Sequence, residues 1–215
     1  MSKTILVTGG AGFIGSALIR FLINETPHTV VNVDKLTYAG NLESLNSVVQ
    51  NPRYSFEKKD IACKLDISTL FKKYKPDFVM HLAAESHVDR SISSPEDFIR
   101  TNVVGTFTLL EASLHYYNSL KNEKRDNFRF HHISTDEVFG SLPTREGEFT
   151  KQSPFKPNSP YAASKASAEM ICRSFYKTYG MDIRIVRGCN NFGPWQHEEK
   201  LIPKTIKSAL DNREI

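Results

Sequence analysis

The sequence predicts an α/β fold in which helices cover both faces of a parallel sheet. Three observations favour it. Short apolar runs typical of strands alternate with longer runs of helical periodicity, the connections are mostly short, and a glycine-rich turn joins the first strand to the first helix. The 215 residues can bury a sizeable core and form one large domain or two small ones.

The first strand and helix flank the glycine-rich residues 8–15, with apolar residues before the turn and an apolar helical face after it. Gly9 suits the positive φ of a tight turn, Gly12 lets the backbone approach a pyrophosphate, and Gly15 lets the helix pack closely. The helix N-terminus adds unpaired N–H groups. The stretch therefore predicts a dinucleotide site, but its spacing is G-x-x-G-x-x-G rather than G-x-G-x-x-G, and a turn without a ligand is the alternative.

The second strand, residues 29–33, ends at Asp34, close to the position expected for the acidic residue of a dinucleotide site. A carboxylate there accepts hydrogen bonds from both hydroxyls of an adenosine ribose and repels a 2′-phosphate. The sequence therefore predicts NAD rather than NADP, and the neighbouring Lys35 weakens this preference a little.

The remaining elements continue the alternation. Helices are predicted over residues 42–49, 67–74, 102–117 and 160–179, and strands over residues 54–58, 78–82, 128–134 and 182–187. The polar residues 118–127 predict a solvated connection. Because strands and helices alternate, right-handed crossovers are expected, and the fold class is a doubly wound parallel sheet of the Rossmann type.

Ligands of such sheets bind at the carboxyl ends of the strands. Asp60 and Ile61 follow the third strand and suit an adenine amino group and ring face, although a turn residue beside a core residue is an equal alternative. After the fourth strand, the small Ala83 and Ala84 allow the backbone to approach a nicotinamide ribose. His87, in the same loop, is interpreted as a hydrogen-bonded structural residue.

After the fifth strand, the sequence Ser134, Thr135, Asp136, Glu137 places two carboxylates and a hydroxyl at the mouth of the predicted cofactor site. Two acids that share a pocket of low dielectric can serve as one acid and one base, because repulsion and desolvation raise the pKa of at least one. The alternative is a solvated helix start, since Ser, Thr and Asp are good N-cap residues.

The predicted helix 160–179 begins with Tyr161 and Lys165, whose i, i+4 spacing places them on one face. A nearby ammonium favours tyrosinate, so we expect Lys165 to lower the pKa of Tyr161. Tyr161 would then act as a base that takes a hydroxyl proton during hydride transfer to NAD. A Tyr–Lys pair on a helix surface is the alternative.

The composition argues against several other functions. A net charge of +4 without a basic run gives no case for nucleic acid binding, and no apolar run is long enough for a membrane helix. Cys63, Cys172 and Cys189 lack the spacing of a metal site, and we expect each to be a small buried residue in a reducing compartment. The sequence thus predicts a cytoplasmic protein without a metal.

Five runs carry a resemblance to a known family: NVDKLTYAGNL at residues 32–42, LAAESHVDRS at 82–91, STDEVFG at 134–140, NNFGP at 190–194 and EKLIP at 199–203. With the glycine turn, Asn102 and the Tyr161–Lys165 pair, they resemble the extended short-chain dehydrogenase/reductase family, and within it the dTDP-glucose 4,6-dehydratases. The likeness runs over essentially the whole chain.

The resemblance implies that two sets of residues bind ligands. NAD would be contacted by Phe13, Ile14, Asp34, Lys35, Leu36, Thr37, Asp60, Ile61, Leu82, Ala83, Ala84, Glu85, Ser86, Thr101, Tyr161, Lys165 and Asn191. A nucleotide-linked glucose, dTDP-glucose by resemblance, would be contacted by Ser86, Thr135, Asn190, Lys200 and Leu201.

It also implies a reaction. Tyr161 would take the proton of the sugar 4-hydroxyl while C4 is oxidised, with Thr135 bound to the 4-oxygen. Glu137 would take the C5 proton, Asp136 would protonate the departing 6-hydroxyl, and hydride would return to C6. The product would be a 4-keto-6-deoxy sugar nucleotide plus water.

Family members continue into a smaller domain, so we expect this chain to be a fragment. Residues 1–188 would form the NAD-binding domain and residues 189–215 the beginning of the substrate-binding domain, and turnover would be weak or absent. A homodimer is expected through helices 102–117 and 160–179, although packing on the sheet needs the same apolar residues. The alternatives are an NAD-binding module without turnover and a nucleotide-sugar 4-epimerase, which needs no acid pair.

Overall fold

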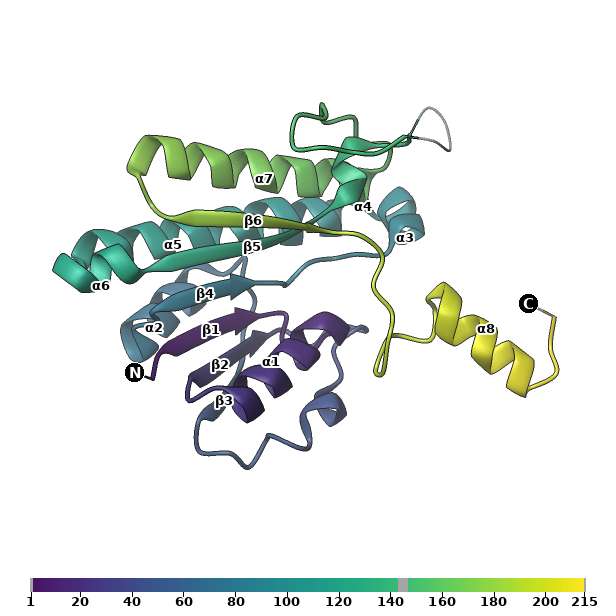
Figure 1. Ribbon diagram of the computed structural model, residues 1–215, viewed down its shortest axis with the longest axis horizontal. Helices are drawn as coiled ribbons and strands as arrows, with labels where there is room; N and C mark the ends of the chain where they lie inside the picture. Colours follow the sequence, from purple (N-terminus) through teal and green to yellow (C-terminus); the bar gives the residue numbers. More distant parts are fainter. Residues whose placement is uncertain (1, 143–146, 215) are drawn as a thin grey trace.

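The computed structural model describes residues 2–142 and 147–214, and within them a six-stranded sheet forms the centre of the protein (Figure 1). All neighbouring strands are parallel, in the order β3-β2-β1-β4-β5-β6. The strands are β1 (Thr4–Thr8), β2 (Thr29–Asp34), β3 (Tyr54–Lys58), β4 (Phe78–His81), β5 (Arg129–Thr135) and β6 (Ile183–Gly188).

The strand order reverses direction at β1. The chain moves outward from β1 to β3 and then returns to place β4 on the other side of β1, where Val7 pairs with Asn32 of β2 and with Met80 of β4. The carboxyl ends of β1 and β4 therefore border a crevice at a topological switch point, where ligands of such sheets bind.

Helices lie on both faces of the sheet (Figure 1). One face is covered by α1 (Phe13–Glu25) and the 3₁₀ helix η1 (Leu42–Leu45); the other is covered by α2 (Lys64–Tyr74), α5 (Thr106–Ser119) and α7 (Pro160–Tyr179). The remaining helices are α3 (Val88–Ser93), α4 (Pro95–Phe98), the π-helix η2 (Ile99–Gly105), α6 (Asn122–Asn127), the 3₁₀ helix η3 (Asp136–Phe139) and α8 (Leu201–Leu210).

Strand residues alternate between two apolar cores. Ile5 and Val7 point to the α1 side and pack with Ile19 and Leu22, whereas Leu6 points to the opposite side. The core on that side is the larger one and includes the buried side chains of Val79, Leu109, Leu110, Phe128, Phe130 and Phe175. Strands buried on both faces are typical of a parallel sheet, so the predicted doubly wound fold class is confirmed.

The predicted helix over residues 160–179 and the strand over 54–58 are confirmed with the same bounds, and the other predicted strands differ by a residue or two at their ends. The helix expected over residues 42–49 is wrong in length, because a 3₁₀ segment capped by Asn41 ends at Leu45. The connection 118–127 contains the short helix α6, which has no buried residue. Of the three cysteines expected to be buried, only Cys172 is; Cys63 is half-buried and Cys189 is exposed.

The chain leaves the sheet after β6. Its last helix, α8, has no buried residue and lies apart from the sheet, at the end of an extended segment (Figure 1). A domain boundary after Gly188 stays a prediction; the outer limits of the two predicted domains, Met1 and Ile215, lie outside the described residues. Within those residues, no helix is long and apolar enough to cross a membrane.

Candidate active site

A cavity of about 630 Å³ lies at the carboxyl ends of the strands. Its wall begins at the glycine turn after β1, passes the end of β2 and the loop after β4, and reaches α7 at Tyr161 and Lys165. The segment 195–200, which follows β6, closes its remaining side. The cavity therefore occupies the switch-point crevice that the strand order creates.

At two positions of the glycine turn, a side chain would collide with the backbone. Gly9 has φ of 73°, and a Cβ there would lie 2.5 Å from the backbone nitrogen of Ala83 at the end of β4. A Cβ on Gly15 would lie 2.1 Å from the carbonyl oxygen of Gly9. Gly12 is the N-cap of α1 and borders the cavity. The first amides of α1, which lack intrahelical acceptors, thus begin at the cavity wall.

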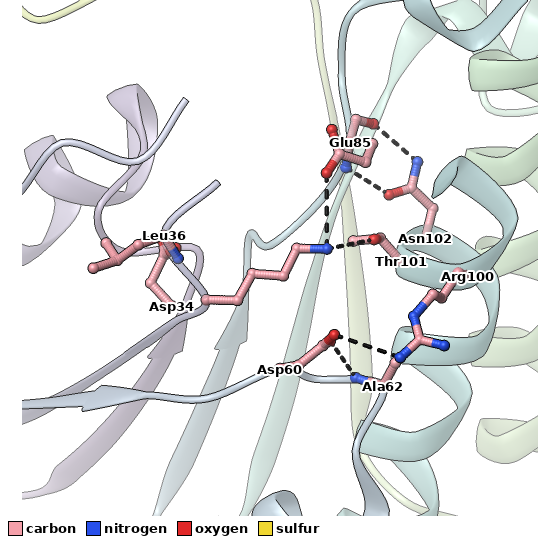
Figure 2. A network of polar contacts seen from close by, with 9 residues as sticks. Asp34, Leu36, Asp60, Ala62, Glu85, Arg100, Thr101 and Asn102 are labelled. Atoms are coloured by element: carbon pink, nitrogen blue, oxygen red, sulfur yellow. Dashed lines mark hydrogen bonds and ion pairs between the residues drawn. The ribbon is translucent and has the colours of Figure 1, made fainter. Parts of the chain in front are cut away.

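Asp34, at the end of β2, is held by two backbone amides. One of its oxygens accepts a hydrogen bond from the amide of Ala11 at 3.0 Å. The other accepts from the amide of Leu36 at 2.8 Å; both of these residues are labelled in Figure 2. Leu36 itself has φ of 58°, so the chain turns sharply behind the carboxylate. Each oxygen keeps a lone pair for a further donor, and the carboxylate borders the cavity in a fixed orientation.

Asp60 follows β3, and its carboxylate faces Arg100 of η2. It accepts from the amide of Ala62 at 2.9 Å and lies 3.8 Å from a guanidinium nitrogen of Arg100, as Figure 2 shows. Ile61, which is buried, borders the cavity, whereas Asp60 does not. Of the two interpretations of this pair, the turn residue beside a core residue describes these contacts directly.

Tyr161 and Lys165 lie on the first turns of α7, which begins at the N-cap Ser159 and has Pro160 in its first position. Both side chains are largely buried, and the Lys165 ammonium donates to the carbonyl of Ile133 at 2.6 Å. Burial lowers the pKa of Lys165 to about 8. Its side chain therefore titrates near physiological pH.

The pKa of Tyr161 is raised to about 12, chiefly by burial and then by the carboxylate of Glu137. A hydrogen bond with Thr135 lowers it, and Asp136 adds to the rise. The expectation that Lys165 would lower this pKa is therefore wrong for the chain by itself, because desolvation and two acids dominate. The same coupling indicates that the acids and the phenol share one electrostatic environment.

Thr135, Asp136 and Glu137 join β5 to η3. The Thr135 hydroxyl accepts from the amide of Glu137 at 3.2 Å, so it caps η3 as the helix-start interpretation expects. Burial raises the pKa of Glu137, Asp136 raises it further, and Lys200 lowers it. The helix-start interpretation is thus confirmed, and the role of the two acids as an acid–base pair stays a prediction.

The segment 195–200 is attached to the loop after β4. Glu199 pairs with Arg90 at 3.1 Å and with His87 at 3.5 Å, and Lys200 donates to the carbonyl of Ser86 at 3.5 Å. Arg90 also stacks on the ring of Tyr38, 3.7 Å from its centroid. His87, whose ring accepts from the amide of Arg90, has the structural role that the sequence favoured.

The structure brings most of the predicted site residues to this one cavity. Its wall includes Gly9, Gly12, Phe13, Ile14, Gly15, Asp34, Lys35, Thr37, Ile61, Leu82, Ala83, Ala84, Glu85, Ser86, Thr101, Tyr161, Lys165 and Lys200. Eight others lie outside the wall: Leu36, Asp60, Thr135, Asp136, Glu137, Asn190, Asn191 and Leu201. Thr135, Asp136 and Glu137 are coupled to Tyr161 as described, but Asn190, Asn191 and Leu201 are exposed.

Sequence reasoning missed the single wall residues Val33, Lys59 and Ile133 and two longer segments of the wall, residues 38–41 and residues 195–199. Both segments lack helical or strand periodicity, so only the topology brings them to the cavity. Among the described residues no group of His, Cys, Asp and Glu has the geometry of a metal site.

Comparisons with known proteins show which proteins this chain is similar to. The model of the family described as GDP-mannose 4,6 dehydratase matches residues 6–214. A dTDP-glucose 4,6-dehydratase from Haemophilus influenzae is 57% identical over 207 residues, which are 96% of this chain and 61% of that protein. The chain thus spans about 60% of the length of this curated relative.

Solved structures agree in fold. A crystal structure of a dTDP-glucose 4,6-dehydratase from Streptomyces venezuelae with NAD bound has a TM-score of 0.88 at 44% identity and covers 97% of this chain and 62% of its own. A UDP-glucose 4-epimerase from Thermotoga maritima, solved with UDP-glucose, has a TM-score of 0.86 at 30% identity. The match covers 99% of this chain and 64% of the epimerase chain.

Proposed function

Because this chain belongs to the family described as GDP-mannose 4,6 dehydratase, we propose that it binds NAD and contributes the catalytic residues for dehydration of a nucleotide-linked glucose. The proposed substrate is dTDP-glucose, which the names of the relative from Haemophilus influenzae and the enzyme from Streptomyces venezuelae specify. The product would be the 4-keto-6-deoxy sugar nucleotide, with water as the second product.

The observation that carries the proposal is the single cavity that joins the glycine turn to Tyr161 and Lys165. The residues present fit NAD. A Cβ at Gly9 or Gly15 would collide with backbone, so the turn keeps α1's amides open toward a pyrophosphate, and Asp34 presents a fixed carboxylate for a ribose. When bound, NAD supplies a positively charged hydride acceptor, and that charge favours the tyrosinate form of Tyr161.

The chain's own residues would then move the protons. Tyr161 takes the proton of the sugar 4-hydroxyl, and the Thr135 hydroxyl orients the 4-oxygen. Glu137, whose pKa is raised by burial, takes the C5 proton, and Asp136 gives a proton to the departing 6-hydroxyl. Each of these acid–base roles would be worth about 10²–10⁴ in rate.

The acid pair favours a dehydratase over an epimerase. A 4-epimerase oxidises and reduces C4 and needs only the Tyr–Lys pair, whereas loss of water across C5 and C6 needs one base and one acid. Asp136 and Glu137 supply these next to Tyr161, as their effects on its pKa indicate. Within the proposal, the choice of a dehydratase over an epimerase therefore rests on the two acids, because both kinds of enzyme use the dinucleotide site.

The test begins with calorimetry of NAD binding, followed by incubation of the NAD-loaded chain with dTDP-glucose. In the Glu137→Gln variant, NADH absorbance should still rise, because C4 oxidation does not need this base, and the 4-keto glucose nucleotide should accumulate. Asp136→Asn removes the acid of the same pair, and this second variant should also stall after C4 oxidation. Unimpeded formation of the 6-deoxy product by Glu137→Gln would overturn the dehydratase assignment.

The same assay separates the second proposal, an NAD-binding module without turnover. The observation that favours it is the share of the relative from Haemophilus influenzae that the chain spans, 61%. If NAD binds by calorimetry, but the wild type forms no 6-deoxy product from dTDP-glucose and Glu137→Gln forms no NADH, the second proposal is supported over the first.

We also propose a cytoplasmic homodimer. The free cysteines Cys63, Cys172 and Cys189 suit a reducing compartment. For the dimer, α5 and α7 lie side by side and bury Leu109, Leu110 and Phe175 against the sheet, yet Phe107, Met170 and Tyr176 remain 37%, 48% and 48% exposed. These helices therefore have apolar residues for both the sheet and a second copy.

A further inference from the structure

Lys35 spans the adenosine end of the cavity instead of pointing into solvent. Its side chain runs from the end of β2 to η2, where the ammonium donates to the Thr101 hydroxyl at 3.0 Å. The same nitrogen lies 3.8 Å from a carboxylate oxygen of Glu85, in the loop after β4. The lysine that follows Asp34 is thus held by two groups on the opposite wall.

One of these two groups, Glu85, is anchored in the fold through Asn102. The amide of Glu85 donates to the Asn102 side-chain oxygen at 2.9 Å, and the Asn102 side-chain nitrogen donates to the carbonyl of Glu85 at 3.0 Å. That nitrogen also donates to the Ser164 hydroxyl of α7 at 2.9 Å, and Asn102 is buried. The Glu85 carboxylate, with a side-chain exposure of 13%, therefore has a fixed backbone behind it.

Adjacent residues of opposite charge act in opposite directions on the predicted preference for NAD over NADP. Asp34 repels a phosphate on the ribose 2′-oxygen, whereas a free Lys35 would attract one. We propose that Thr101 and Glu85 hold Lys35 away from the ribose, so that Asp34 alone decides and the chain discriminates against a 2′-phosphate. This inference rests on the proposed binding of NAD.

The energetics favour the restrained lysine. To reach a 2′-phosphate, Lys35 would have to leave Glu85, and a largely buried carboxylate would lose its nearest cation. Asp34 cannot turn away to make room, because the amides of Ala11 and Leu36 hold both of its oxygens. The cofactor preference then depends on an interaction between two walls of the cavity, not on Asp34 by itself.

The test measures the dissociation constants of NAD⁺ and NADP⁺ by calorimetry, with NADP⁺ also measured by displacement of NAD⁺. The readout is the ratio of the NADP⁺ constant to the NAD⁺ constant. In Glu85→Gln the ratio should fall by about three- to tenfold, the range for one charged hydrogen bond at a partly exposed position. Thr101→Val should lower the ratio in the same direction, and this variant changes no charge.

The controls depend on Lys35. Lys35→Met alone should leave the ratio unchanged, and Glu85→Gln combined with Lys35→Met should return it to the wild-type value. Lys59→Met provides a matched control, since Lys59 also borders the cavity but pairs with Asp66 at 2.9 Å. In that background, Glu85→Gln should still lower the ratio.

Two results would overturn the inference. If Glu85→Gln lowers the ratio equally when Lys35 is Met, the effect is a general loss of negative charge. If Lys35→Met alone raises the ratio, Lys35 already contacts the phosphate and is not restrained. If the wild-type chain binds neither dinucleotide, the proposed function is refuted as well. Failure of the proposed function is thus distinguishable from failure of the inference about Lys35, in which NAD⁺ still binds.

Discussion

Gly12 and Gly15 lie three residues apart at the start of α1, but a methyl group at each position would meet different surroundings. At Gly15 it would lie 2.1 Å from the carbonyl oxygen of Gly9 and 2.8 Å from the Cα of Gly10. At Gly12 the nearest atom is the Gly9 oxygen at 3.3 Å, and the residue borders the cavity. The first glycine serves the ligand and the second serves the packing of the helix.

We therefore expect Gly15→Ala to lower the free energy of unfolding by about 1–3 kcal/mol, the usual cost of overpacking, and to weaken NAD binding with it. Gly12→Ala should keep most of the stability and still weaken NAD binding, because its methyl group points to the ligand side. Urea unfolding and calorimetry separate the two effects. Equal stability of both variants would show that α1 can shift away from the turn.

His81 gives the stability a predictable dependence on pH. It is fully buried between the hydroxyls of Thr8 and Thr106, at 2.8 and 2.9 Å, and burial lowers its pKa to about 3. The unfolded chain, with a histidine pKa near 6.5, then binds more protons between about pH 6.5 and pH 3. Its contribution to stability is complete above pH 6.5 and is lost as the pH falls through that window.

From pH 7 to pH 5, His81 alone should remove about 2 kcal/mol from the free energy of unfolding. His132, whose pKa is also lowered by burial, acts in the same direction, whereas Glu137 acts in the opposite one because its pKa is raised. Urea unfolding of the wild type and of His81→Gln at both pH values isolates the term. The variant should lose about 2 kcal/mol less; an identical loss would contradict the assignment.

Single residues were predictable where a rule of local chemistry applied. The positive φ at Gly9 and the close packing at Gly15 follow from what a glycine turn requires. The pKa of Tyr161 did not follow from its spacing to Lys165, because it depends on burial and on Glu137, which comes from η3. Side-chain environment is a tertiary property, and i, i+4 spacing alone does not contain it.

At the scale of elements, one ion pair links three of them. Glu169 of α7 is buried, with 1% side-chain exposure, and Arg187 of β6 binds both its oxygens at 2.6 to 3.1 Å. The Arg187 guanidinium also lies 5.0 Å from the ring centroid of Phe139, which ends η3. The helix that carries Tyr161 and the turn that carries Asp136 and Glu137 are thus fixed to each other.

Removal of one partner should therefore be much worse than removal of both. Arg187→Met leaves a buried carboxylate unpaired and should reduce the free energy of unfolding by about 2–4 kcal/mol, somewhat below a fully buried pair because Arg187 is partly exposed. Combining it with Glu169→Met should recover most of the loss. Urea unfolding of the three proteins tests this, and a double variant as unstable as the single one would refute it.

The sequence predicted the strands and α7 well because each has a strong local signal: apolar β-type runs for the strands, and Ser159, Pro160 and Gly180 at the ends of α7. It missed α3, α4, α6 and α8 and the π-helical geometry of η2. The three shortest, α3, α4 and α6, have too few residues for a periodicity. The π-helix η2 joins α4 to α5 through backbone geometry that composition does not encode.

At the scale of the whole molecule, the strand order assembles the site. Gly9 and Ala83 are 74 positions apart but come within contact distance, because β4 returns to pair with β1. The rule that ligands bind at the carboxyl ends of such strands predicted the wall at Asp34, Ile61, Ala83 and Ala84, and the family resemblance supplied most of the other predicted wall residues. It could not predict residues 195–199, since their position depends on pairs such as Glu199 with Arg90 rather than on a strand.

The exposed apolar side chains of α5 and α7 make the oligomeric state testable. If they form the proposed dimer interface, Met170→Glu should place a charge in a desolvated contact and yield a monomer with nearly unchanged stability, because Met170 is 48% exposed in the single chain. Phe21→Glu is the matched control: Phe21 is 57% exposed on α1, on the opposite face of the sheet.

Sedimentation velocity should find dimers for the wild type and Phe21→Glu and monomers for Met170→Glu. Dimers of Met170→Glu as tight as the wild type would move the interface elsewhere, and a monomeric wild type would remove it.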